Sequence, residues 1–73
     1  MTSVEFVDTD GATGTIFADL AIDYEGRFAE TIDAVVSSVD CDGTATDDDL
    51  QDVSVELYLE GHFAKLDLVR GES

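Results

Sequence analysis

Hydrophobic and polar residues alternate in two stretches of the chain, one near each end. In the first stretch, Val4 and Phe6 alternate with Ser3, Glu5 and Val7, and the alternation resumes over residues 16–24 after a turn-rich segment at 8–14. A period of two residues is typical of a half-buried β-strand. We therefore predict an N-terminal hairpin with a loop of about five residues, in which Phe6 lies opposite Ile16.

The second stretch predicts another hairpin, over residues 52–69. Apolar residues alternate on both sides of Glu60-Gly61, which we interpret as a two-residue turn. This register gathers the apolar residues of both strands on one face and pairs Tyr58 with Phe63 on the other. A shift by one residue would turn each apolar set to the wrong side, so the pattern favours this register.

Segment 27–40 allows two interpretations. Its apolar residues lie on one stripe of a helix of about three turns, with polar residues on the other side. Residues 24–30 also resemble residues 59–65, which would make Glu25-Gly26 another hairpin turn followed by a strand. A hairpin in that register would place polar residues on the buried face of the sheet, so the pattern favours the helix.

The expected fold class is therefore α+β, with a ββαββ order, a four-stranded sheet and one helix. The alternative is an all-β fold, a five-stranded antiparallel meander or small barrel. We expect residues 1–73 to form a single domain, with an acidic loop at 40–52 that contains six aspartates.

Composition changes this picture mainly through charge. The 73 residues include 18 Asp or Glu and 3 Lys or Arg, for a formal net charge of −15, although 44% of the chain is apolar. So many apolar residues argue against disorder, and the missing basic face argues against direct binding of nucleic acid. No apolar run reaches the roughly 18 residues of a membrane span. The first residues also lack the pattern of a signal peptide, so we expect a cytoplasmic protein.

The acids are spread along the chain, Asp outnumbers Glu twelve to six, and Lys65 is the only lysine. In composition the chain resembles proteins of extreme halophiles. At about 1 M ionic strength the Debye length is roughly 3 Å, so monovalent cations screen the repulsion between carboxylates. We therefore interpret the acidity as an adaptation to molar salt in a small non-catalytic protein. The alternative is that the chain is an acidic mimic of nucleic acid that blocks a basic protein surface.

Two groups of acids are weak candidates for metal binding: Asp8 and Asp10 in the first loop, and Asp47, Asp48 and Asp49 in the acidic loop. Calcium favours several oxygen ligands, but neither group has the spacing of an EF-hand loop. We therefore predict no metal site and no cofactor, and a calcium-responsive module is the third hypothesis. Phosphate-binding loops, nucleophile elbows and histidine metal motifs are also missing, so we expect no enzyme activity.

If the helix covers one side of the sheet, an apolar patch rich in aromatic residues is left on the other side. Its members are Val7, Phe17, Tyr58, Phe63 and Val69. An exposed apolar patch on a highly charged protein suggests an interaction site. Because a chain of this length buries a small core, we expect the patch to join two copies as a homodimer or to bind another protein.

Overall fold

The computed structural model describes residues 2–71 and begins with the predicted N-terminal hairpin. Strands β1 (Thr2–Asp8) and β2 (Thr13–Phe17) run antiparallel. Along β1, Val4 and Phe6 are buried while the residue between them is exposed. This is the alternation expected of a strand with one face in the core.

The register of this hairpin differs from the prediction by two residues. Phe6 lies opposite Gly14 rather than opposite Ile16. The loop is shorter than predicted, because the backbone N–H of Asp8 donates a hydrogen bond of 2.8 Å to the carbonyl oxygen of Ala12. A Cβ atom at Gly14 would overlap the ring of Phe6, so the ring covers the glycine across the strand pair.

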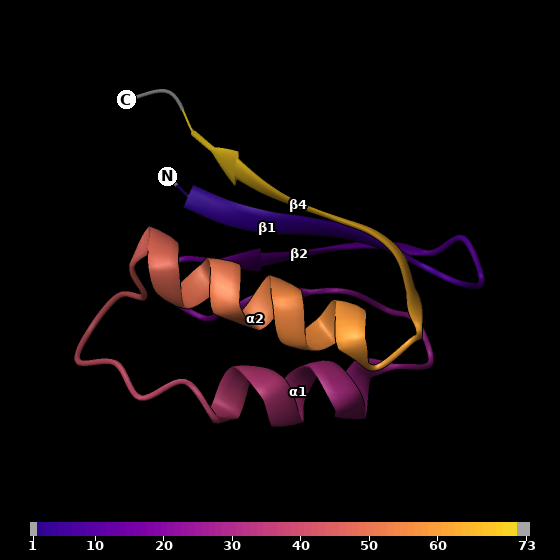
Figure 1. Ribbon diagram of the computed structural model, residues 1–73, viewed down its shortest axis with the longest axis horizontal. Helices are drawn as coiled ribbons and strands as arrows, with labels where there is room; N and C mark the ends of the chain where they lie inside the picture. Colours follow the sequence, from indigo (N-terminus) through magenta and orange to yellow (C-terminus); the bar gives the residue numbers. More distant parts are fainter. Residues whose placement is uncertain (1, 72–73) are drawn as a thin grey trace.

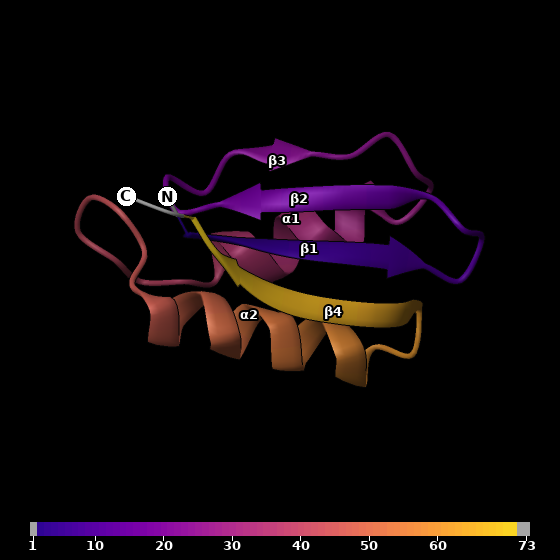
Figure 2. The ribbon, with the colours of Figure 1, turned by 90° about the horizontal axis from the view of Figure 1, so that it is seen from above.

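Two further strands complete a four-stranded antiparallel sheet of order β3-β2-β1-β4 (Figure 2). Strand β3 is short (Ile22–Asp23), and β4 (Phe63–Arg70) pairs with β1 along the other side. The predicted four-stranded sheet is confirmed, and all of its strand pairs are antiparallel. The partner of β4, however, is β1 and not residues 52–59.

Helix α1 (Ala29–Ser37) lies within the segment 27–40, as its apolar stripe predicts. The buried residues Ile32, Val35 and Val36 face the core from one side of this helix. The interpretation of the segment as a strand is therefore wrong. The all-β alternative with five strands is wrong for the same reason.

Helix α2 (Asp47–Leu59) occupies the place of a predicted strand, so the ββαββ order with one helix is incorrect. A capping box fixes its first turn. The Thr46 hydroxyl accepts a 3.2 Å hydrogen bond from the N–H of Asp49, whose carboxylate accepts one of 3.0 Å from the N–H of Thr46. The segment 40–52, predicted as a loop, is therefore helical from Asp47 onward.

Gly61 lies just beyond the end of α2, with a φ of 76°, and does not form a hairpin turn. The buried residues of α2 are Leu50, Val53 and Leu57, spaced by three and four residues as on a helix. The alternation of apolar residues misled the prediction, because Val55 points to solvent instead of joining Val53 and Leu57 in the core.

Both helices cover the same face of the sheet, and its other face is open (Figure 1). The molecule is thus a small α+β domain with an open four-stranded antiparallel sheet. In residues 2–71, neither helix has the length and apolar character needed to cross a membrane. The core lies between the layers and consists of Val4, Phe6, Ile16, Ile32, Val35, Val36, Ala45, Leu50, Val53, Leu57 and Phe63.

A β-bulge in β4 turns Phe63 toward this core. Asp8 pairs with Phe63 and Val7 pairs with Lys65, so Ala64 between them is the extra residue. The bulge shifts the alternation of β4 by one position. Phe63 consequently faces the helices with 5% of its surface exposed, whereas regular alternation would place it beside Lys65 on the open face.

Candidate functional site

Three of the five residues predicted to form the interaction patch share the open face of the sheet. Ser3 of β1 has Phe17 of β2 on one side and Val69 of β4 on the other. Val7 lies on the same face, since it is four residues from Ser3 along β1. Val7 and Phe17 are half-buried, and Val69 is 37% exposed.

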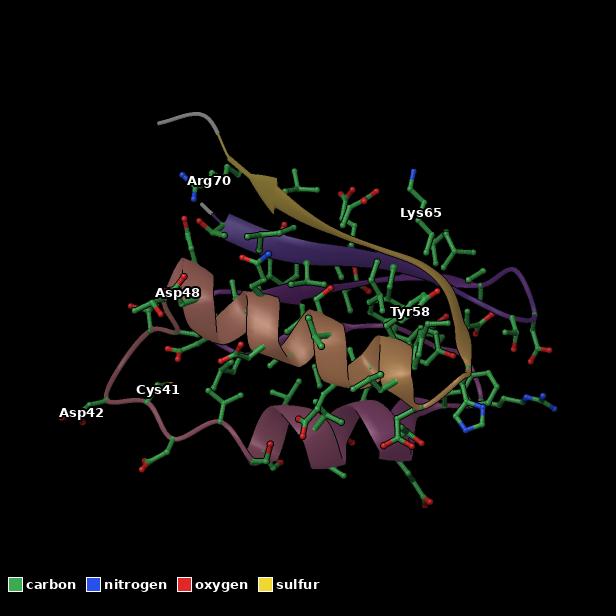
Figure 3. All side chains as sticks on the ribbon, in the orientation of Figure 1. Cys41, Asp42, Asp48, Tyr58, Lys65 and Arg70 are labelled. Atoms are coloured by element: carbon green, nitrogen blue, oxygen red, sulfur yellow. The ribbon has the colours of Figure 1, made fainter. Side chains whose placement is uncertain are left out.

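Tyr58 and Phe63 lie elsewhere, so the predicted cross-strand pair between them does not exist. Tyr58 is on α2 with 62% of its surface exposed (Figure 3). Phe63 is in the core, where its ring centre lies 5.3 Å from that of Phe6 in an edge-to-face contact. The aromatic part of the open face is thereby reduced to Phe17.

Charged and hydroxyl side chains separate the apolar residues of the open face. Asp23, Thr15, Glu5 and Asp67 follow one another across the middle of the sheet. Lys65 points away from the helices (Figure 3) and forms an ion pair of 3.2 Å with Asp67. A hollow of about 330 Å³ lies in this region. The open face is thus mainly polar.

Asp8, at the end of β1, is the one buried acid among residues 2–71, with 2% of its surface exposed. Its Oδ1 accepts hydrogen bonds from the N–H groups of Asp10 (2.9 Å) and Ala12 (2.8 Å). Its Oδ2 accepts one from the hydroxyl of Tyr24, whose oxygen accepts a bond of 3.3 Å from the N–H of Phe28. The carboxylate therefore joins the β1–β2 turn to the segment before α1.

These hydrogen bonds shift two pKa values in opposite directions. The Tyr24 hydroxyl holds the pKa of Asp8 below its ordinary 3.8, and the N–H groups of the turn act in the same direction, while burial opposes them. Burial raises the pKa of Tyr24 above its ordinary 10.0, and the Asp8 carboxylate adds to this effect. An aspartate that begins a turn is a recognisable sequence signal, but its bond to a tyrosine distant in sequence is not.

Arg27 and His62 lie near the same end of the molecule. Arg27 forms an ion pair of 2.8 Å with Asp10, and its guanidinium lies 4.8 Å from the centre of the Phe28 ring. The imidazole of His62 stacks on Phe28 with 4.7 Å between ring centres. These are packing contacts around Phe28, and we assign this end of the molecule a structural role.

The acids considered for metal binding have separate environments. Asp8 and Asp10 have the partners described above. Asp49 closes the capping box of α2, while Asp47 forms an ion pair of 2.9 Å with a basic side chain of β4. Asp48 is exposed in the first turn of α2 (Figure 3). Across the part of the chain that the structure describes, no three metal-ligating side chains gather closely enough to hold an ion.

Three large apolar side chains are exposed on α2: Val55 at 54%, Tyr58 at 62% and Leu59 at 75%. Spacings of three and four residues place them on one side of the helix, and we call them the α2 stripe. The strand prediction placed Val55 and Leu59 on a buried face. The capping box at Thr46 was the sequence signal for the helix, and with it for the stripe.

A groove of about 450 Å³ borders the α2 stripe, between α2 and the segment that follows α1. Val55 belongs to both the stripe and the groove. We call this feature the acidic groove because it is lined by four carboxylates, with three valines and a serine: Asp40, Asp49, Asp52 and Glu56, with Val39, Val53, Val55 and Ser38.

Comparisons of the chain with protein-family models, with curated proteins and with solved structures found no match. Function is therefore inferred from the geometry and charge of the chain itself.

Proposed function

We propose that this chain is a small non-catalytic protein adapted to molar salt, which acts as a protein-interaction module in a salt-rich cytoplasm. The supporting observation is the spread of exposed acids over every layer. Glu5 and Asp67 lie on the open sheet face, Asp33 on α1, and Asp52 and Glu56 on α2. A mimic of nucleic acid would instead gather its acids on one face, so this spread favours salt adaptation.

Pairing within the chain leaves most of these acids uncompensated. The three basic residues each have an acidic partner: Arg27 with Asp10, Lys65 with Asp67, and Arg70 with Asp47. Exposed pairs of this kind contribute about 0–1 kcal/mol each. The other acids repel one another over a Debye length of about 10 Å at 0.1 M salt but only roughly 3 Å at 1 M. Monovalent cations are therefore the expected counterions of the folded protein.

The α2 stripe is the better interaction surface in this proposal. Its three apolar side chains are more exposed than Val69 of the open face, and Phe17 and Val7 are half-buried. Exposed apolar side chains that lie together on a small charged protein are a common sign of an interaction site. Among residues 2–71, no three carboxylates lie close enough together to hold a metal ion, so nothing there favours a calcium-responsive module.

Two variants of equal charge test the salt-adaptation part. Asp52→Asn with Glu56→Gln removes two charges from α2, and Glu5→Gln with Asp33→Asn removes two charges from the sheet and α1. Both variants should raise the unfolding free energy in about 0.2 M KCl. The increase should be roughly 0.5 kcal/mol for Asp52→Asn with Glu56→Gln, because this variant removes a like-charge pair four residues apart on a helix. Neither should have an effect in about 3 M KCl.

The measurement is urea denaturation followed by circular dichroism. If both variants leave the unfolding free energy unchanged at low salt, repulsion between surface acids does not limit stability and the proposal fails.

A further inference from the structure

The α2 stripe and the acidic groove form one continuous surface. Val55 is 54% exposed and also lines the groove, so the apolar strip runs from the groove to Leu59 at the end of the helix. Asp52 and Glu56 line the groove on the same helix. The surface thus combines an apolar centre with a border of carboxylates.

Charge decides which kind of partner fits this surface. None of the side chains described as lining the groove is basic. All three basic residues of the chain already have acidic partners of their own. A second copy placed on α2 would bring another surface of the same acidic chain, with its net charge of −15, against Asp52 and Glu56. Like charges in contact across an interface cost several kcal/mol, whereas positive groups opposite them favour association.

Other features of the molecule give weaker support for a binding site than this surface does. The hollow on the open face is smaller than the acidic groove, and both members of the Lys65–Asp67 pair line it. Asp8 has its hydrogen-bond partners within the chain. Cys41 lies in the α1–α2 loop (Figure 3) with Asp42 beside it, and the basic side chains that the structure describes each pair with an acid elsewhere.

We infer that the outer face of α2, with the acidic groove beside it, binds a basic amphipathic helix of another protein. The inference rests on the proposed function and gives it a partner class. Apolar side chains of the partner helix lie on Val55, Tyr58 and Leu59, and its Lys or Arg side chains meet the carboxylates of the groove. This is the helix-in-groove mode of recognition, with charge setting the choice of partner.

The test uses two synthetic amphipathic peptides of about 18 residues, or five helical turns. Both carry Leu on one face, flanked by Lys in one peptide and by Glu in the other. Binding is measured by calorimetry at the lowest KCl concentration at which circular dichroism shows every protein variant to be folded, so that charges are screened as little as possible. We expect the Lys peptide to bind at least about tenfold more tightly than the Glu peptide.

Matched variants separate this surface from general attraction to an acidic protein. Val55→Ser with Leu59→Ser should weaken binding of the Lys peptide at least about tenfold, because the Leu face of the peptide then loses two of the three apolar side chains that it would bury. Val69→Ser, on the open sheet face, should leave it unchanged. Asp52→Asn with Glu56→Gln should weaken binding more than Glu5→Gln with Asp23→Asn, although each pair removes two charges.

Equal losses in the paired variants, or equal affinity for both peptides, would overturn the inference. So would a protein that dimerises alone and becomes monomeric in Leu59→Ser by sedimentation, since the stripe would then bind a second copy. Absence of peptide binding in a protein whose folding still strengthens with KCl would refute this docking mode alone. Folding that is independent of salt would refute the proposed function instead.

Discussion

Gly14 and Phe6 show how single residues determine what hydrophobic alternation leaves open. Alternation predicts β1 and β2 correctly, but a shift by two residues keeps every side chain on its face. The pattern alone therefore cannot distinguish Phe6 opposite Ile16 from Phe6 opposite Gly14. Room for the aromatic ring decides between them, because Gly14 lacks a Cβ.

Gly14→Ala should lower the unfolding free energy by about 1–3 kcal/mol, the usual range for overpacking a core. The new methyl group would overlap the Phe6 ring, which has a buried position in the core. In a Phe6→Leu background the same substitution should have a smaller effect, because the ring is gone. Urea denaturation of the four proteins measures the coupling. An equal effect in both backgrounds would mean that the ring does not occupy this place.

The buried hydrogen bonds of Asp8 predict a dependence on pH. Its pKa is lower in the folded protein than its ordinary 3.8, so the folded state binds fewer protons than the unfolded state as the pH falls. The stabilising contribution of Asp8 is therefore complete above the unfolded pKa and is lost as the pH falls through the lower folded value. Wild type should exceed Asp8→Asn in unfolding free energy at about pH 6, with a difference that shrinks below about pH 4.

Denaturation at constant KCl over this pH range checks the difference. Asp23→Asn, at an exposed position of β3, serves as the control and should show no such narrowing. A gap between wild type and Asp8→Asn that is the same at every pH would contradict the role assigned to the ionised carboxylate.

At the scale of elements, the hydrophobic pattern predicted α1 but not α2. The apolar residues of α1 fit a helical period, whereas Val53 and Leu57 of α2 fit both a strand and a helix. Local chemistry resolves the ambiguity, through the capping box at Thr46 and the positive φ of Gly61. The bulge that buries Phe63 depends on pairing with β1, so the local pattern could not reveal it.

Thr46→Ala should lower the unfolding free energy by about 1 kcal/mol, the typical cost of removing an N-cap side chain. The substitution removes the acceptor for the N–H of Asp49. Thr44→Ala, at an exposed position of the same loop, is the matched control and should have little effect. Equal losses in the two variants, measured by urea denaturation, would argue against the capping box.

At the scale of the whole molecule, the edges of the sheet are protected while one side of α2 is not. β3 has two residues, and β4 carries a bulge and Lys65, the only lysine of the chain. Short strands, bulges and lysines are common defences against edge-to-edge association. The proposal of a salt-adapted surface rests on the composition and on the spread of exposed acids. The α2 stripe was missed at the sequence level, because the strand interpretation placed Val55 and Leu59 in a core.

The most direct test of the account is the thermal unfolding midpoint of the wild-type chain over a KCl series from about 0.1 to 3 M, a range in which the Debye length falls from roughly 10 Å to below about 3 Å. If the acidic surface is an adaptation to salt, the midpoint rises steadily with KCl. The rise should be smaller in Asp52→Asn with Glu56→Gln, which carries two fewer charges. A chain that is fully folded at the lowest salt, with a midpoint that stays constant or falls as KCl is added, would contradict it.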